Sequence, residues 1–398
     1  MKKGWETKPL AELCEVFADG DWVESKDQSS DGIRLIQTGN VGNGIFKDRA
    51  EKARYISEEK FKHLRCTEIF EGDCLISRLP DPVGRSCLLP DTSERMITAV
   101  DCTIVRFKRA TYLPEFFNLY SQSDEYLATV VNECTGTTRS RISRSNLGLT
   151  PIPVPPLSEQ QRIVGLLDGA FGGLATAQAH AAQNLQNARD LFESHLQSVF
   201  TKRGPGWVEK SLGEVADLLD CLHKTPIYAE TGFPMVRVTD IKPGFLDLSK
   251  TRKVDEQTFK AFSKGRNPKA GDIVFSRVGS CGVSALVNSD APFCLGQNTV
   301  FILPKINSVL LYHFLNSPNA KQQFEGFIDG TTQPTISMKS IRKVAVPIAP
   351  PVEHDGLVAK LDSMREEAQR LESIYQRKLA ALAALKKSLL HQAFSGEL

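Results

Sequence analysis

A duplication of the whole chain constrains the fold more than any other feature of this sequence. A proline-rich stretch, IPVPPLSEQQRIVGLLD, begins at Ile152, and a similar stretch, VPIAPPVEHDGLVAKLD, begins at Val346. Each stretch opens a long segment with periodic apolar residues. Self-similarity over a long period is typical of repeated structural units. We therefore expect two copies of one architecture along the chain.

The spacing between matching motifs separates a globular part from a helical part. The motifs EGDCLISR and AGDIVFSR, which end at Arg78 and Arg277, lie 199 residues apart. From the GTT motifs at Gly136 and Gly330 to the end of the repeat at Phe394, the spacing stays at 194 residues. Changing spacings indicate insertions and deletions in surface loops. A constant spacing indicates a continuous packed helix, which tolerates no insertion.

The chain accordingly divides into four segments. Globular parts at residues 1–152 and 204–346 are followed by helices at residues 153–203 and 347–398. Short apolar runs rich in β-branched residues predict strands in both globular parts: IRLIQ, DCLIS and CTIVRF, then PMVRV, DIVFS and TVFIL.

Helices are also predicted within the globular parts. Apolar residues recur every three or four positions around residues 112–131 and 309–324. The expected fold class is α/β: a mixed α+β domain in tandem duplication, with a long α-helix after each copy.

The two long segments carry heptads. Apolar residues alternate at intervals of three and four through residues 164–199 and again through residues 357–389. Heptads sustained over this length predict a coiled coil. A pseudo-two-fold relation between the copies would make it antiparallel. Ser158, followed three residues later by Gln161, predicts a capping box at the start of the first helix.

Further apolar residues widen the stripe on both helices beyond the needs of a two-stranded coil. Such a stripe predicts a surface for another protein. The alternative is that the helices only brace the globular parts. The candidates for partner binding are Leu166, Phe171, Leu191, Leu196, Leu379 and Leu390.

Composition limits the class of protein. Apolar residues make up 41% of the chain and charged residues 24%, as in soluble globular proteins. The sequence has no long unbroken apolar window, and MKKGWETKPL lacks the apolar core of a signal peptide. We expect a cytoplasmic protein that does not enter a membrane. Nine cysteines without a C-x-x-C pair argue against a zinc site and a disulfide framework.

Catalytic motifs are missing from the sequence. It contains no G-x-x-x-x-G-K-[ST] phosphate loop, no H-E-x-x-H metal motif and no G-x-S-x-G nucleophile motif. The Asn- or Asp-Pro-Pro-aromatic tetrapeptide that grips a flipped amino base is also absent. The sequence predicts a binding protein that has no catalytic residues and holds no metal.

Basic stretches recur in both copies, although the net charge is only +2. Seven Lys and Arg residues face four carboxylates between Phe46 and Cys66, and seven face three between Gly244 and Lys269. Such patches suit contacts with nucleic-acid phosphates, although an ordinary solvated face has the same composition. Further basic residues follow the two GTT motifs: Arg139, Arg141 and Arg144, then Lys339, Arg342 and Lys343.

Polar side chains at strand ends are the candidates for reading bases. Arg, Asn, Gln, Asp and Thr are the residue types that bind base edges, although Asn and Asp are also common in turns for local reasons. The candidates are Gln37, Thr38 and Asn40 in copy one, Arg237, Thr239 and Asp240 in copy two, and Arg78, Arg85 and Arg277. These polar residues differ between the copies, so we expect the two copies to read two different half-sites.

These features resemble one known family. The stretches IPVPPLSEQQRIV and VPIAPPVEHDGLV, the GTT-x-x-x-IS motifs at Gly136 and Gly330, and the C-terminal LLHQAFSGEL are similar to the specificity subunit of type I restriction–modification systems. The resemblance covers the whole chain. Copy two departs from the pattern at His354, where the family has Gln, which leaves one local contact in question.

The resemblance implies a function and a set of partners. Each globular part would be a target-recognition domain, and the antiparallel coiled coil would set the gap in a split double-stranded DNA target. Two methyltransferase subunits and two restriction subunits would bind this chain. S-adenosylmethionine, ATP and Mg²⁺ would be held by those partners, and this chain would hold no cofactor. Two alternatives remain: a scaffold whose heads bind proteins, and an enzyme of an unrecognised class.

Overall fold

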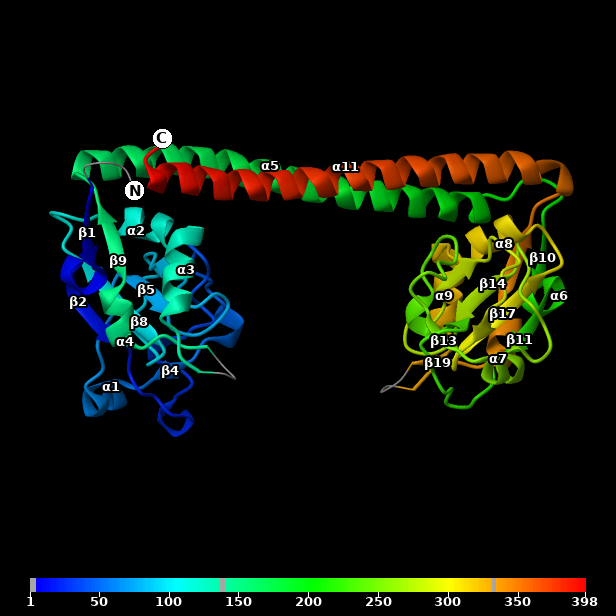
Figure 1. Cartoon of the computed structure of the whole chain (residues 1–398), viewed down its shortest axis with the longest axis horizontal. Coiled ribbons are helices and arrows are strands. Elements are labelled where there is room, and N and C mark those ends of the chain that lie inside the picture. The colour runs from blue at the N-terminus through cyan, green and yellow to red at the C-terminus, as the bar shows by residue number, and fades with distance from the viewer. Residues whose placement is uncertain (1–4, 137–139, 331–333) are drawn as a thin grey trace. The chain divides into compact units, whose positions relative to one another are not determined.

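The computed structural model describes residues 5–136, 140–330 and 334–398, and the chain forms two compact units. Unit 1 comprises Met1–Ala181 and Arg377–Leu398, and unit 2 comprises Ala182–Gln376. Each unit contains one globular part, which we call head 1 (elements β1 to β9) or head 2 (β10 to β20), and segments of both long helices. Figure 1 labels many of these elements.

Head 1 is built on two small sheets and a ladder. The ladder pairs β1 (Glu6–Pro9) with β9 (Pro151–Val154). The antiparallel four-stranded sheet has the order β2 (Cys14–Asp19), β8 (Cys102–Phe107), β5 (Cys74–Ser77) and β6 (Ser86–Leu88). The second sheet has the order β4 (Tyr55–Ile56), β3 (Ile33–Ile36) and β7 (Met96–Thr98), with β3 and β7 parallel.

Short helices complete head 1. They are α1 (Glu58–Leu64), α2 (Pro114–Tyr120), α3 (Asp124–Asn132) and α4 (Arg144–Leu149). The predicted helical segment at residues 112–131 is therefore two helices. The break comes at Ser123, whose hydroxyl accepts a hydrogen bond from the Tyr126 amide and so caps α3.

Head 2 repeats the ladder and both sheets of head 1 with the same strand order, and it adds one short strand pair. Its ladder pairs β10 (Val208–Ser211) with β20 (Ala345–Ile348). Its four-stranded sheet has the order β11 (Ala216–Asp220), β17 (Thr299–Pro304), β14 (Ile273–Ser276) and β15 (Ser284–Leu286). Its three-stranded sheet has the order β13 (Arg252–Val254), β12 (Phe233–Val236) and β16 (Cys294–Leu295), and β18 (Ile328–Asp329) pairs with β19 (Thr335–Ile336).

The helices of head 2 follow the same plan. They are α6 (Leu212–Val215), α7 (Glu256–Ser263), α8 (Ser308–Leu315), α9 (Pro318–Glu325) and α10 (Met338–Arg342). The common strand order confirms the predicted duplication, and the six predicted strands are β3, β5, β8, β12, β14 and β17. The fold is the expected mixed α/β domain in tandem.

Both predicted long helices are present, as α5 (Leu157–Thr201) and α11 (His354–Ser395). The capping-box prediction was wrong, because α5 begins before Ser158 and the Pro156 carbonyl accepts the amides of Glu159 and Gln160. The Gln160 side chain is fully buried and donates to the Pro155 carbonyl at 2.8 Å.

The departure at His354 keeps an equivalent contact. Its Nε2 lies 2.9 Å from the Ala349 carbonyl oxygen, and Ala349 occupies in copy two the place of Pro155. The contact left in question by the sequence is therefore replaced rather than lost.

Within each unit the segments of α5 and α11 run antiparallel. In unit 1, Arg162 near the start of α5 donates to the Leu398 carbonyl, and Lys386 lies over the Phe171 ring. In unit 2, Arg189 forms an ion pair with Glu372 at 3.0 Å. Buried side chains follow the predicted heptads at Leu167, Leu174, Ala181 and Ala188 on α5 and at Leu361 and Ala368 on α11.

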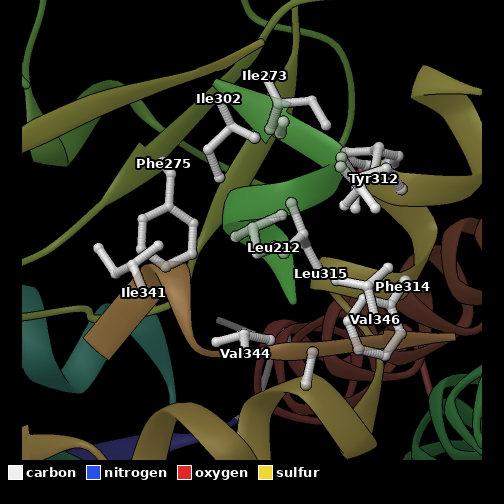
Figure 2. Packing of buried hydrophobic residues seen from close by; sticks show 14 of the residues in the cluster. Leu212, Ile273, Phe275, Ile302, Tyr312, Phe314, Leu315, Ile341, Val344 and Val346 are labelled. Carbon is white, nitrogen blue, oxygen red and sulfur yellow. The ribbon is translucent and has the colours of Figure 1, made fainter. Parts of the chain in front are cut away.

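Helix ends close the core of each head. In unit 2, Leu196 and Phe200 of α5 join the core that Figure 2 shows around Phe275 and Phe314. In unit 1, Leu390 and Phe394 of α11 take the equivalent places. Among the described residues, we find no helix that combines the length and apolar character needed to span a membrane.

Truncation of Phe394 tests this closure. Its ring is buried and lies 5.3 Å from the Phe116 ring and 5.1 Å from the Tyr120 ring. We expect Phe394→Ala to lower the free energy of unfolding of unit 1 by about 3–5 kcal/mol, as measured by urea titration. Leu149→Ala, at a position that is 71% exposed, should change it by less than about 0.5 kcal/mol. Equal effects would contradict the closure of head 1 by α11.

Candidate nucleic-acid interface

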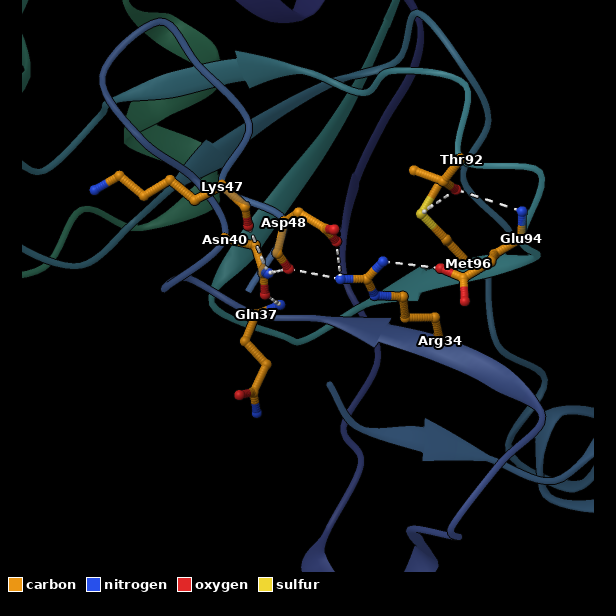
Figure 3. A network of polar contacts seen from close by, with 8 residues as sticks. All are labelled: Arg34, Gln37, Asn40, Lys47, Asp48, Thr92, Glu94 and Met96. Carbon is orange, nitrogen blue, oxygen red and sulfur yellow. Dashed lines mark hydrogen bonds and ion pairs between the residues drawn. The ribbon is translucent and has the colours of Figure 1, made fainter. Parts of the chain in front are cut away.

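The first group of predicted recognition residues follows β3 in head 1 (Figure 3). Asn40 Nδ2 donates to the Lys47 and Asp48 carbonyls, each at 2.9 Å, and its Oδ1 accepts the Gln37 amide at 3.0 Å. The Asn40 side chain therefore uses its amide to close the loop between β3 and residue 48. Beside it, the buried Arg34 forms ion pairs with Asp48 and Glu94.

Gln37 and Thr38 are placed differently from Asn40. Both are half-buried, and Figure 3 shows the Gln37 side chain directed away from the Asn40 network. The Gln37 side-chain amide makes no hydrogen bond to another described residue. Gln37 is therefore free to bind an external group, whereas Asn40 holds the loop that carries it.

Head 2 has an ion pair at the matching position. Arg237 Nε and Nη2 donate to the Asp240 carboxylate at 2.9 and 2.8 Å, and the Arg237 amide donates to it at 2.9 Å. These bonds raise the pKa of Arg237. Thr239, between them, is exposed. An external ligand could contact Thr239 directly, but it could bind the Arg237 guanidinium only by competing with the Asp240 carboxylate.

Arg85 has a structural environment. Its guanidinium is buried and donates to the carbonyls of Val41, Leu79, Pro82 and Thr38 at 2.7 to 3.0 Å. Burial lowers its pKa. These four bonds tie the loop that follows β3 to the loop that follows β5.

Arg78 and Arg277 are also held inside their heads. Each follows the central strand β5 or β14 and forms an ion pair with an aspartate, Asp19 in head 1 and Asp220 in head 2. The side chain of Arg78 is 5% exposed and that of Arg277 is 13% exposed. Neither guanidinium presents a surface to DNA in this conformation.

Exposed basic residues flank these pairs. In head 1, Arg141 and Arg144 have side chains that are each 47% exposed. In head 2, Lys339 and Arg342 lie exposed on α10, and Lys343 follows them. Arg342 Nη2 donates to the Leu218 carbonyl at 3.3 Å. Arg139 lies outside the described residues, as do two residues of each GTT motif.

The sequence analysis did not single out the exposed apolar residues after β2 and β11. Trp22 is 69% exposed and its indole Nε1 donates to Glu24 at 3.3 Å. In the matching loop of head 2, Ile227 is 77% exposed and the Tyr228 ring lies under Arg252. Exposed aromatic rings beside basic groups can stack on bases. The sequence did contain a signal for these residues, because a large apolar residue stands in a polar loop, as in DGDWVESKD.

The predicted partner-binding leucines fall into two groups. Leu166 and Leu191 are 41% and 56% exposed, whereas Leu196 and Leu390 are buried in the cores of the heads. Phe171 and Leu379 are half-buried. Leu385 was not among the predicted partner-binding residues, although it is 47% exposed and occupies in α11 the place of Leu191 in α5. The outer faces of the two helices therefore share one exposed apolar position.

One cluster in head 2 contains metal-ligand side chains. Ligand atoms of Asp220, Cys221 and His223 lie within 4.8 Å of one another. The Asp220 carboxylate is already bonded to Arg277 at 2.7 Å, and burial raises the pKa of the Cys221 thiol. A guanidinium already occupies the cation position at this carboxylate, so we assign no metal to the cluster.

Comparisons with known proteins agree on one family. The family model described as Type I restriction modification DNA specificity domain matches residues 2–176 and 205–376. The Type I restriction enzyme EcoKI specificity subunit of Escherichia coli (strain K12) is 24% identical over 432 residues, which cover 100% of this chain and 90% of that protein. The EcoBI specificity subunit of Escherichia coli is 22% identical over 316 residues, which cover 72% of this chain and 66% of the relative.

Solved structures show the same fold. A chain from a study of complex assembly and conformational transition of the type I R-M system superposes with a TM-score of 0.81 at 20% identity and covers 100% of this chain and 99% of its own. The HsdS subunit from Thermoanaerobacter tengcongensis gives a TM-score of 0.55 at 19% identity, with 100% and 98% covered.

The contrast between Asn40 and Gln37 can be tested by stability. Asn40→Ala removes three hydrogen bonds that close a loop, so we expect a loss of about 1–3 kcal/mol in the free energy of unfolding of unit 1. Gln37→Ala should change that free energy by less than about 0.5 kcal/mol. Urea titration of both variants measures the difference. A larger loss for Gln37→Ala would show that the two roles have been exchanged.

Proposed function

The chain belongs to the type I restriction modification DNA specificity family, and from that membership we propose that its two heads read the two parts of a split double-stranded DNA target. As a specificity subunit it serves DNA target recognition. In the proposal, head 1 reads one half-site, head 2 reads the other, and the paired helices fix the gap. The four segments with boundaries at residues 152, 203 and 346 are the functional divisions that we propose.

One observation carries this proposal: the heads share a buried framework and differ at the polar residues that follow β3 and β12. A buried serine on β6 or β15 is bonded to an asparagine in both heads, as Ser86–Asn118 and Ser284–Asn316. By contrast, Gln37 in head 1 corresponds to the ion-paired Arg237 in head 2. Two domains that recognise different DNA sequences need the same buried framework and different polar side chains at the positions that contact bases.

The residues proposed to meet DNA are a subset of the sequence candidates. We propose base contacts for Gln37, Thr38, Arg237 and Thr239, because Arg, Gln and Thr side chains can bind base edges and these four are exposed or half-buried. We propose phosphate contacts for Arg141, Arg144, Lys339 and Arg342, which are exposed and basic. Arg139 remains a candidate on its sequence alone. Arg78, Arg85 and Arg277, whose guanidinium groups are held inside the heads, are left out.

The chain is proposed to act without chemistry of its own. Methyltransferase and restriction subunits, two of each, would assemble on it and would supply S-adenosylmethionine, ATP and Mg²⁺ sites. We propose no cofactor in this chain and a cytoplasmic location, where the DNA is. The exposed leucines at equivalent positions of α5 and α11 support two equivalent docking points.

Salt dependence tests DNA binding by the heads. Each phosphate contact contributes about −0.9 to the slope of log K against log salt, so Arg144→Ala should make the slope shallower by about 1 and weaken binding to all sequences alike. The measurement is a fluorescence titration with duplex DNA at several salt concentrations. The matched control is Arg109→Ala, an exposed arginine at the opposite end of β8 from Asp101. A wild-type slope near zero would reject DNA binding and favour heads that bind protein.

The exposed leucines test partner docking. We expect Leu191→Asp or Leu385→Asp alone to reduce the stoichiometry from two methyltransferase subunits to one, and the double variant to bind none. Placing a carboxylate in an apolar contact leaves it desolvated and unpaired. Analytical ultracentrifugation of the assembled complex gives the stoichiometry. Gln183→Asp, at an exposed polar site on α5, is the control. Two subunits retained by the double variant would place docking elsewhere.

A further inference from the structure

An ion pair in head 1 joins several chain segments. Asp19 is the last residue of β2, and Arg78 directly follows β5, with its Nη2 3.2 Å from Asp19 Oδ1. The same Nη2 donates to the Val100 carbonyl at 2.6 Å. Through its main chain, Arg78 donates to the Asp101 carbonyl at 2.9 Å and accepts the Ile142 amide at 3.3 Å. Arg78 thus links β2, the turn before β8 and the segment that leads into α4.

Head 2 contains the same junction at the same place in its fold. Asp220 is the last residue of β11, and Arg277 directly follows β14, with its Nη1 2.7 Å from Asp220 Oδ2. The Arg277 amide donates to the Asn298 carbonyl at 2.9 Å, and its carbonyl accepts the Ile336 amide at 2.9 Å. The two junctions therefore agree in the ion pair and in two main-chain hydrogen bonds.

Stability alone is a poor explanation for these pairs. Arg78 Nε and Asp19 Oδ1 are buried and make no hydrogen bond in the described chain, and the same holds for Arg277 Nε and Asp220 Oδ1. Burial also lowers the pKa of Arg78. An ion pair whose guanidinium is mostly buried and which leaves atoms unsatisfied loses in desolvation much of what it gains in attraction. Its presence in both heads points to a geometric role.

Each junction anchors a segment that carries exposed basic residues. In head 1, Arg141 and Arg144 flank the anchored Ile142, and their side chains lie 2.8 Å from Asp101 and 3.9 Å from Asp19. In head 2, Ile336 is followed at once by α10 with Lys339 and Arg342. The basic residues differ between the heads, whereas the anchor is the same.

We propose that the Asp19–Arg78 and Asp220–Arg277 pairs are positioning residues for target recognition, each holding the basic segment of its own head in the geometry that reads one half-site. This inference rests on the proposed function and deepens it. Neither ion pair touches DNA. The pairs act through the segments around Ile142 and Ile336, so each affects one half-site only.

A second ion pair in each head provides a matched control. Arg106 is paired with the buried Asp73 at 2.6 Å in head 1, and Arg266 is paired with the buried Asp272 at 2.9 Å in head 2. Both aspartates lie just before β5 or β14, at the opposite strand end from Arg78 and Arg277. These pairs have the same chemistry, although their aspartate rather than their arginine is the buried partner, and they do not bond the basic segments.

The experiment compares conservative variants in the full chain assembled with its methyltransferase subunits. Asp19→Asn and Arg78→Lys are compared with Arg106→Lys, and Asp220→Asn and Arg277→Lys with Arg266→Lys. Binding is measured by competition among duplexes in which one half-site at a time is altered. In the head 1 variants, we expect the ratio of affinities for the intact and the altered duplex to fall at least tenfold at one half-site and less than twofold at the other. In the head 2 variants, the large loss should fall on the other half-site. Both control variants should keep this ratio within twofold of the wild-type value at both half-sites.

Hydrogen exchange gives a readout that does not depend on DNA. Asp19→Asn should speed exchange of the Ile142 amide at least tenfold and leave Ile336 unchanged, and Asp220→Asn should do the reverse. Equal losses at both half-sites, or equal losses in the controls, would overturn the proposal. If the wild-type chain showed no sequence preference, the proposed function would be rejected instead. If the Asp19→Asn and Asp220→Asn variants then also left exchange at Ile142 and Ile336 unchanged, the positioning role would be overturned as well.

Discussion

Insertion of helix-end aromatic residues into the heads is the interaction on which the rest of the structure depends. Phe394 packs on Phe116 in unit 1, and Phe200 packs on Phe314 in unit 2, with ring centroids 5.3 and 5.4 Å apart. A close-packed core holds a side chain that is inserted into it in one position. These phenylalanines therefore fix the orientation of each head relative to the helix segment in its own unit. The sheets of each head, and the loops proposed for recognition, are connected to the helices through this contact.

Much of the fold could be predicted from the sequence, because periodicity and duplication are local or repeated signals. The strands and long helices followed from apolar spacing, and the heptads correctly gave Leu167 and Leu361 as buried. The capping box failed because the Pro156 carbonyl, rather than a serine side chain, accepts the first amides of α5. A main-chain acceptor leaves no mark in residue identity, so no motif could have revealed it.

The candidate site was harder to predict, because exposure depends on tertiary neighbours. Asn40 and Gln37 are both polar residues at a strand end, but only the folded loop shows that Asn40 is bonded to main-chain groups. Similarly, Leu191 and Leu196 lie on one helix with the same residue type, and only the position of head 2 buries the second. Sequence patterns gave candidate regions, whereas the contacts that each side chain makes within them could be read only from the folded chain.

The composition of the two units has a consequence for biosynthesis. Unit 2 is one continuous stretch, Ala182–Gln376, whereas unit 1 needs Arg377–Leu398 in addition to its own first 181 residues. A chain emerging from the ribosome can therefore complete head 2 before head 1, although head 1 is made first. Until the last turns of α11 are synthesised, Phe394 cannot pack on Phe116 and Tyr120, which leaves head 1 the more exposed of the two to chaperones and proteases.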